Sequence, residues 1–202
     1  MEDVLQVYAL PKEEAVARLC LDERPCQLIE EVLMPLPMQG GSTKRIDNEY
    51  KREGTCSVFL AYDLDKGQRY AEVREHRTKQ DYAEFVDNLI AQHYRNAEKV
   101  VLIQDNLNIH KKGSFYESLS QERAGELSSL IDFHFTAQQG SWWNRAEIEF
   151  CALCRQCLNR RMASSRELAK ERKAWVAQRN KEATKIHWRF TLKDATEKMK
   201  SQ

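Results

Sequence analysis

Three acidic residues lie in local sequences that suit metal-dependent chemistry. Asp22 and Asp105 each end an apolar stretch, and Glu147 closes the sequence Asn-x-x-Glu. Carboxylate oxygens are the ligands that hard divalent cations prefer. Two such cations can drive in-line displacement at a phosphodiester. The three residues are therefore candidate metal ligands for chemistry on DNA.

Two predicted strands carry the aspartates to one edge of a sheet. Residues 15–21 and 99–104 are apolar enough for buried strands, and open α/β folds collect ligands at the carboxyl ends of such strands. Either Asp alone is more often a helix cap or a turn residue. The two together, with the Asn-x-x-Glu helix start downstream, favour a shared site for ions about 4 Å apart.

The remaining pattern predicts helices on both faces of a mixed sheet. Residues 55–75 have the alternation and central turn of a β-hairpin, and Thr78 is a plausible cap for an amphipathic helix. The N-terminal stretch is expected to be a short helix or an irregular lead-in, broken at Pro11, and a loop over 25–42 is expected to flank a short helix at 27–33. The further elements expected are a helix over 114–127, a strand over 130–136, and helices over 145–161 and from Ser164 or Ser165 to about Lys181. A hairpin beside strands joined through helices is typical of a mixed sheet.

Length and composition place the chain among soluble single-domain proteins. Its 202 residues suffice for one well-buried domain. No apolar run reaches about 18 residues, and no secretion signal opens the chain, so we expect no membrane span and a cytoplasmic location. Six cysteines then indicate free thiols. Cys151, Cys154 and Cys157 follow one side of a helix and are predicted to be small buried hydrophobes rather than a metal cluster.

The charge is unevenly distributed along the chain. Residues 151–202 contain 14 Lys and Arg against 5 Asp and Glu, whereas the rest contains 18 against 26. A basic end on an acidic body suits a polyanionic partner. Arg160, Arg161 and the cations that follow are candidates for contact with the DNA backbone. A plain solvated helix is the alternative.

The acidic residues lie within longer motifs. These are Cys20-Leu21-Asp22-Glu23 with Pro25, Gln104-Asp105-Asn106-Leu107-Asn108 with His110, Gly140-Ser141-Trp142 with Asn144 and Ala146-Glu147-Ile148-Glu149, and further stretches at 34–38, 49–50, 54–56, 75–81 and 188–195. Together they resemble the DDE transposases of bacterial insertion sequences, in the branch related to the mariner-like superfamily. The resemblance covers nearly the whole chain.

The resemblance implies a ribonuclease H-like fold, an α/β mixed five-stranded sheet flanked by helices. It also implies that Asp22, Asp105 and Glu147 form a metal-binding triad for two Mg²⁺ ions, for which Mn²⁺ can substitute. The activity would be DNA strand cleavage and strand transfer, carried out by a homo-oligomer on DNA. We expect the catalytic domain over residues 1–160 and a basic helical extension over 161–202 that packs on it.

Full-length relatives carry helix-turn-helix modules, whereas only 21 residues precede Asp22 here. A separately encoded DNA-binding partner would complement such a chain. The alternative function is a non-catalytic, truncated remnant that binds DNA or a full-length transposase and regulates it. The fold alone would also permit a nuclease that acts on another nucleic acid.

Several residues lie near the triad in sequence and are expected to have other roles. Glu149 lies about 200° round a helix from Glu147, so the two do not face one metal pair. Glu23 points away from Asp22 along a strand. Asn106 is expected to orient metal or phosphate, whereas His110 either contacts DNA or makes a structural hydrogen bond.

Two further candidate site residues, Trp142 and Asn144, lie just before Glu147 in the sequence. Trp142 and its neighbour Trp143 either stack on a base or pack in the core. Asn144 is a candidate DNA contact. The sequence departs from the family pattern at Ala137, where Pro is usual, and at Trp143, where an aliphatic residue is usual, so the geometry of this loop is open.

Overall fold

The computed structural model describes residues 2–33, 35–41, 45, 47–137, 140 and 143–200, with side chains to 197. The elements in chain order are α1 (Glu2–Ala9), β1 (Val16–Glu31), β2 (Tyr50–Asp63), β3 (Arg69–Arg74), α2 (Lys79–His93), β4 (Lys99–Gln104), α3 (Lys112–Ser118), α4 (Gln121–Leu130), β5 (Ile131–Phe135), α5 (Arg145–Gln156), α6 (Ser165–Lys181) and α7 (Leu192–Lys200).

The five strands form one mixed sheet in the order β3-β2-β1-β4-β5. β1 and β2, and β2 and β3, pair antiparallel, whereas β4 runs parallel to both β1 and β5. The parallel part is reached through helical connections, as parallel strands require. The predicted hairpin and the predicted mixed five-stranded sheet are both confirmed.

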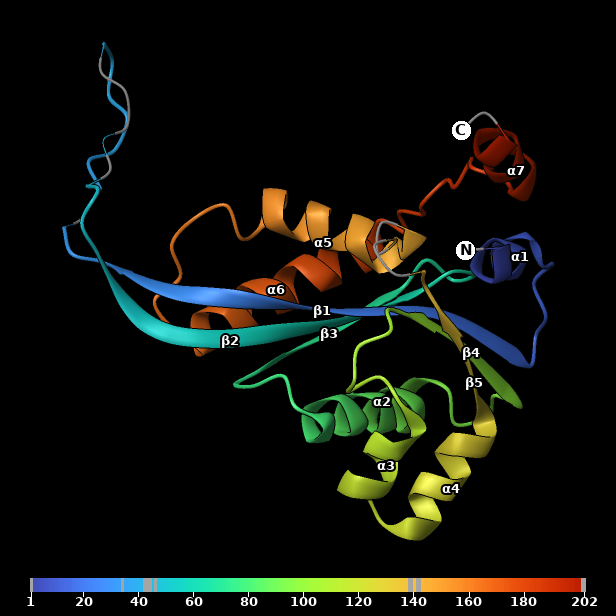
Figure 1. Cartoon of the computed structure of the whole chain (residues 1–202). Coiled ribbons are helices and arrows are strands. Elements are labelled where there is room, and N and C mark those ends of the chain that lie inside the picture. The colour runs from blue at the N-terminus through green and yellow to red at the C-terminus, as the bar shows by residue number, and fades with distance from the viewer. Residues whose placement is uncertain are drawn as a thin grey trace.

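Helices cover both faces of this sheet (Figure 1), with α2, α3 and α4 on one face and α5 and α6 on the other. Strand alternation divides the apolar side chains between the two layers. On β1, Leu19 and Leu21 belong to the core beneath α2, α3 and α4, whereas Cys20 belongs to the core beneath α5 and α6. On β4, Leu102 and Ile103 divide in the same way.

The first two strands extend far beyond the predicted limits. β1 continues to Glu31 and pairs with β2 as far as Tyr50. The short helix expected over 27–33 is therefore wrong, and the loop expected over 25–42 begins only after Glu31. Figure 1 shows this pair projecting past the rest of the sheet. Past Cys20, no described residue pairs with β1 on the β4 side, so Pro25 lies in a strand edge that tolerates it. The register shifts near Gly54, whose positive φ of 106° is typical of a bulge.

Helix boundaries follow side-chain caps. Thr78 accepts a hydrogen bond from the backbone N–H of Asp81, and the Asp81 side chain returns one, which confirms the predicted cap of α2. Ser164 caps α6 in a similar way. The single helix expected over 114–127 is instead two, because Ser120 caps α4 and separates it from α3.

Helix α5 ends earlier than predicted, at Gln156. Its cysteines also differ from expectation. Cys151 is exposed, and Cys154 and Cys157 are only partly buried. They lie toward the solvent side of α5 because Phe150 and Leu153 occupy the face that packs on the sheet.

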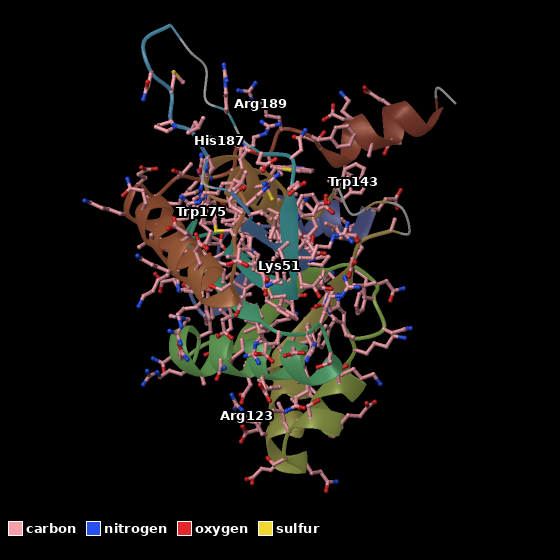
Figure 2. All side chains as sticks on the ribbon, turned by 90° about the vertical axis from the view of Figure 1, so that its left-hand side faces the viewer. Lys51, Arg123, Trp143, Trp175, His187 and Arg189 are labelled. Atoms are coloured by element: carbon pink, nitrogen blue, oxygen red, sulfur yellow. The ribbon has the colours of Figure 1, made fainter. Side chains whose placement is uncertain are left out.

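The C-terminal helices pack on the same body. α6 buries Leu168 and Trp175 in the core shared with α5, while Trp143 joins Leu5 and Ala195 in a separate cluster between α1 and α7. Figure 2 shows the two tryptophans in different parts of the molecule. No helix in the described part of the chain is long and apolar enough to cross a membrane.

Candidate active site

The sheet places Asp22 and Asp105 at the same level on adjacent strands. The parallel register pairs Cys20 with Ile103, so Asp22 lies two residues farther along β1 and Asp105 directly follows Gln104, the last residue of β4. Cys20 and Ile103 both face the core beneath α5. Because side chains alternate along a strand, Asp22 projects to that same face. Asp105 lies near enough for its charge to raise the pKa of Asp22. The two predicted strand-end carboxylates therefore meet at one sheet edge.

Asn144 brings the third carboxylate to this edge. Its side-chain Nδ2 donates a hydrogen bond of 2.7 Å to the backbone carbonyl of Leu21, the residue directly before Asp22. Its Oδ1 accepts from the N–H of Ala146 and so caps α5. One side chain thus joins the start of α5 to β1, and Glu147 follows in the first turn of that helix.

The charges of the three carboxylates act on one another. Burial is the largest cause that raises the pKa of Asp22, to about 7, and the negative charges of Glu23, Asp105 and Glu147 add to it. The N–H of Glu23 donates a 2.8 Å hydrogen bond to Asp22 Oδ1 and opposes this shift. Asp22 therefore lies in a pocket of negative potential that a bound cation would neutralise.

His110 links two carboxylates on opposite sides of this edge. Its Nδ1 lies 2.6 Å from Asp105 Oδ1, and its Nε2 lies 2.9 Å from Glu23 Oε2. Both the histidine and Glu23 have fully buried side chains. Because a carboxylate only accepts hydrogen bonds, both ring nitrogens donate. Glu23 does point away from Asp22, as expected, yet it reaches the second aspartate through this histidine.

The surroundings of His110 favour its charged form. Burial lowers its pKa, but hydrogen bonds to Asp105 and Glu23 outweigh burial and raise the pKa to about 9. Arg77 adds a second positive charge, with Nη1 3.7 Å from Glu23 Oε1. That carboxylate oxygen is buried and has no hydrogen-bond partner among the described residues.

The donor set suits a hard divalent cation by its chemistry. The hydrogen bonds to Asp22 and Asp105 within the described residues all reach Oδ1, which leaves Oδ2 of both aspartates available as an oxygen ligand. No group of three His, Cys, Asp or Glu in the described part of the chain converges into a ready-made metal cage. The charges of Asp105 and Glu147 act on Asp22, so the three carboxylates lie within electrostatic reach of one another.

The other predicted site residues have varied surroundings. Asn106 is exposed, next to Asp105. Asn144 and His110 are fully buried with their polar atoms engaged, so this geometry does not support the DNA contacts expected of them. Trp142 lies outside the described residues, whereas Trp143 packs in the core.

Two predicted DNA-binding arginines already have protein partners. Arg160 is half-exposed and forms an ion pair with Glu171, with 2.6 Å between Nη2 and Oε2. Arg161 binds Glu31 and donates to the backbone carbonyls of Asp47 and Glu49, so it anchors the projecting strand pair. These contacts give Arg161 a structural role. Of the two arginines, Arg160 has the more exposed side chain.

Glu149 has a structural environment, as its place on the helix predicts. Its two carboxylate oxygens each accept a 2.8 Å hydrogen bond from Arg69, and both side chains are fully buried. Arg179 of α6 adds a second guanidinium. This cluster joins β3, α5 and α6 and keeps Glu149 away from the triad.

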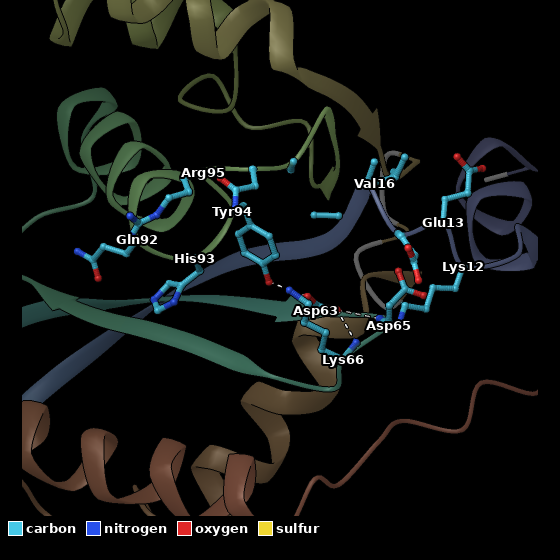
Figure 3. Close-up of a pocket in the computed structure, with 15 residues that line it drawn as sticks. Lys12, Glu13, Val16, Asp63, Asp65, Lys66, Gln92, His93, Tyr94 and Arg95 are labelled. Carbon is cyan, nitrogen blue, oxygen red and sulfur yellow. Dashed lines mark hydrogen bonds between the residues drawn. The ribbon is translucent and has the colours of Figure 1, made fainter.

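A pocket of about 410 Å³ lies at the opposite end of the sheet. Figure 3 shows Tyr94 pointing toward Asp63, to which its hydroxyl donates a 2.6 Å hydrogen bond. Asp63 is paired with Leu19, three residues before Asp22 on β1, and the chain turns away from the acidic edge there. This pocket is therefore separate from the candidate active site.

The sheet order, the helices on both faces and the acidic edge define a ribonuclease H-like domain. The chain belongs to the DDE superfamily endonucleases, whose family pattern matches residues 17–169. The match covers the segments that carry Asp22, Asp105 and Glu147. No curated protein matches the chain.

Solved structures of transposase complexes share this fold. The chain is similar to the Mos1 mariner paired end complex with Mn, at 14% identity and a TM-score of 0.50, over 84% of this chain and 50% of that one. For the Mos1 strand transfer complex the values are 15%, 0.52, 81% and 47%. For the Mos1 transposase paired-end complex with left transposon end they are 13%, 0.52, 84% and 51%. The chain spans about half the length of these relatives, and likeness at such identity shows the fold alone.

Proposed function

We propose that this chain is the catalytic domain of a transposase that cuts DNA strands and joins them to a target. The observation that carries the proposal is the shared level of Asp22 and Asp105 on parallel strands, with Asn144 holding the start of α5 beside them. Two findings support the proposal. The chain belongs to a family of endonucleases, and its fold is similar to that of proteins in transposase complexes. We infer that the substrate is double-stranded DNA at element ends and target.

Asp22, Asp105 and Glu147 would hold two Mg²⁺ ions, or Mn²⁺ in their place. The chemistry that two bound ions supply at such a site is activation of the attacking oxygen and stabilisation of the leaving oxygen of a phosphodiester. The protein contributes the orientation of its oxygen ligands. Asn144 positions Glu147, and the sheet register positions the two aspartates. The exposed amide of Asn106 would contact phosphate.

The basic helix α6 offers a surface for the DNA backbone. Arg166, Lys170 and Lys173 are exposed, have spacing i, i+4 and i+7, and form no ion pair with any other described side chain. Free cations on one helix face can replace the counterions of a phosphate backbone. We propose that such a domain acts as a homo-oligomer on paired DNA ends and that a separate helix-turn-helix partner can supply end recognition.

The test is nicking of labelled supercoiled plasmid by the purified chain in Mg²⁺, Mn²⁺, Ca²⁺ or EDTA. Glu147→Gln should abolish nicking and leave the circular dichroism spectrum unchanged. Glu122→Gln is the matched control, because Glu122 is an exposed carboxylate in the first turn of another helix. That variant should nick as the wild type does.

Each outcome distinguishes the proposed enzyme from its alternative. Nicking that requires Mg²⁺ or Mn²⁺ and disappears only in Glu147→Gln supports the catalytic domain. Nicking that persists in that variant would exclude the triad as assigned. A folded chain that binds DNA without metal-dependent nicking would instead favour the non-catalytic, regulatory remnant.

A further inference from the structure

We propose that Glu23 and His110 form a positioning pair that orients the carboxylate of Asp105 for metal binding. This inference rests on the proposed function, since it assigns a supporting role at the same site. It concerns residues that do not touch the metal themselves. The evidence is the continuous line of polar contacts from Glu23 through the imidazole to Asp105. Nδ1 of His110 donates a 3.0 Å hydrogen bond to the backbone carbonyl of Asp105 and lies in ion-pair contact with its carboxylate.

The first step is that the two carboxylate oxygens of Asp105 have different surroundings. Nδ1 of His110 lies 2.6 Å from Oδ1, and the N–H of Leu107 approaches the same oxygen at 3.4 Å. No described residue donates a hydrogen bond to Oδ2. The histidine therefore holds one oxygen and leaves the other available, which sets the direction in which Asp105 can bind a cation.

The second step is the rigidity of the histidine itself. Nε2 is held by Glu23 Oε2 at 2.9 Å, and the side-chain Nε2 of Gln104 donates a 3.1 Å hydrogen bond to the His110 carbonyl. The ring packs against Tyr82 with 4.9 Å between centroids. The imidazole is fully buried, so it has one orientation. A ring bonded to Glu23 at one nitrogen and packed against Tyr82 can fix the carboxylate that it contacts.

The third step is the burial of Glu23. A fully buried carboxylate is costly unless its charge is compensated. Glu23 lies on the opposite face of β1 from Asp22, so it cannot join the metal ligands directly. Its partners are the His110 ring and, at 3.7 Å, Arg77. The free-energy cost of burying this carboxylate is explained if Glu23 holds the histidine in place, as carboxylates orient the ligand groups of other metal sites.

The test measures Mn²⁺ binding to the full chain by electron paramagnetic resonance, without DNA or turnover. His110→Asn keeps a donor in the place of Nδ1, whereas His110→Gln keeps a donor in the place of Nε2. Losing the donor to Asp105 should weaken Mn²⁺ binding by about 10- to 100-fold in His110→Gln. The affinity of His110→Asn should lie between that variant and the wild type.

A merely structural role predicts a different pattern. Both histidine variants would then lower the thermal midpoint and leave Mn²⁺ affinity unchanged at a temperature where they are folded. Tyr94→Phe is the matched control. It removes a buried hydrogen bond to a carboxylate at the far end of the sheet, so it should lower stability and leave Mn²⁺ binding intact.

Asp105→Asn separates the failure of this inference from failure of the proposed function. If Asp105→Asn binds Mn²⁺ as tightly as the wild type, the metal site itself is misplaced. If it loses Mn²⁺ whereas His110→Gln does not, only the positioning role is overturned. Should neither histidine variant fold, Glu23→Gln decides. Its amide accepts a weaker hydrogen bond than a carboxylate, so Mn²⁺ affinity should fall, and an unchanged affinity would refute the pair.

Discussion

Replacement of Asp22 by Asn should stabilise the metal-free chain, and the gain should grow with pH. Burial, followed by the charges of Glu23, Asp105 and Glu147, raises the pKa of Asp22 from 3.8 to about 7. A carboxyl group whose pKa is higher in the folded state binds more protons there than in the unfolded state. Its ionisation therefore costs stability progressively between pH 4 and 7, and the cost is complete above pH 7.

The size of the effect follows from the two pKa values. One pKa unit corresponds to about 1.4 kcal/mol. The raised pKa of Asp22 therefore costs the folded state about 4 kcal/mol at pH 8, and about 1.5 kcal/mol at pH 5, where the carboxyl is ionised only in the unfolded state. Asn has the same shape and retains the Oδ1 acceptor for the N–H of Glu23. Asp22→Asn should raise the free energy of unfolding by these amounts, a difference of about 2.5 kcal/mol between the two pH values.

The assay is urea unfolding in EDTA at pH 5 and pH 8, followed by fluorescence of the four tryptophans. Asp132→Asn provides a control of opposite sign. A hydrogen bond from Lys99 is the largest cause that lowers the pKa of Asp132, so this carboxylate stabilises the fold at both assay pH values and loses that effect only below about pH 4. Asp132→Asn should therefore lower stability equally at pH 5 and pH 8. Equal effects of Asp22→Asn at both pH values, or a loss of stability at pH 8, would refute the reasoning.

Three further predictions concern the triad, the buried ion pair and the basic helix. Asp105→Asn should abolish metal-dependent plasmid nicking and leave the circular dichroism spectrum intact; normal nicking would exclude it as a ligand. Glu149→Gln should cost about 3 to 5 kcal/mol of unfolding free energy in urea, because the Arg69 charge remains buried. A loss below about 1 kcal/mol would contradict that role. Combining Lys170→Gln with Lys173→Gln should lower the salt slope of DNA binding, measured by fluorescence anisotropy, by about 2. An unchanged slope would remove α6 from the DNA surface.

The central part of the fold could be predicted because its signals are local. Apolar runs before Asp22 and Asp105 identified β1 and β4, and alternation identified the β2–β3 hairpin. Thr78 and Ser164 mark helix starts through hydrogen bonds to residues three positions away. Such patterns depend on a few neighbouring residues, so a single sequence contains enough information to place them.

The projecting strand pair could not be predicted in the same way. The residues between Arg24 and Glu31 lack apolar alternation, because most of them are exposed or only partly buried. Pro25 suggests a loop, and only the partner strand explains why it is tolerated here. Arg161 stabilises the pair from a distant part of the chain. The information that defines this element lies in pairing between segments remote in sequence.

The candidate site shows the same division between local and long-range information. The acidic motifs identified the three carboxylates, and helical geometry correctly separated Glu149 from Glu147. The spacing of Asn144 marked a helix start, but its bond to Leu21 depends on how α5 packs against the sheet.

Glu23 makes the limit clearer. Strand alternation predicts that it faces away from Asp22, and this is correct. Alternation alone cannot show that His110, from a loop on that far side, turns the outward carboxylate into a support for Asp105. A residue on the opposite face of a strand can thus support a site when a third side chain, here His110, contacts both that residue and a residue of the site.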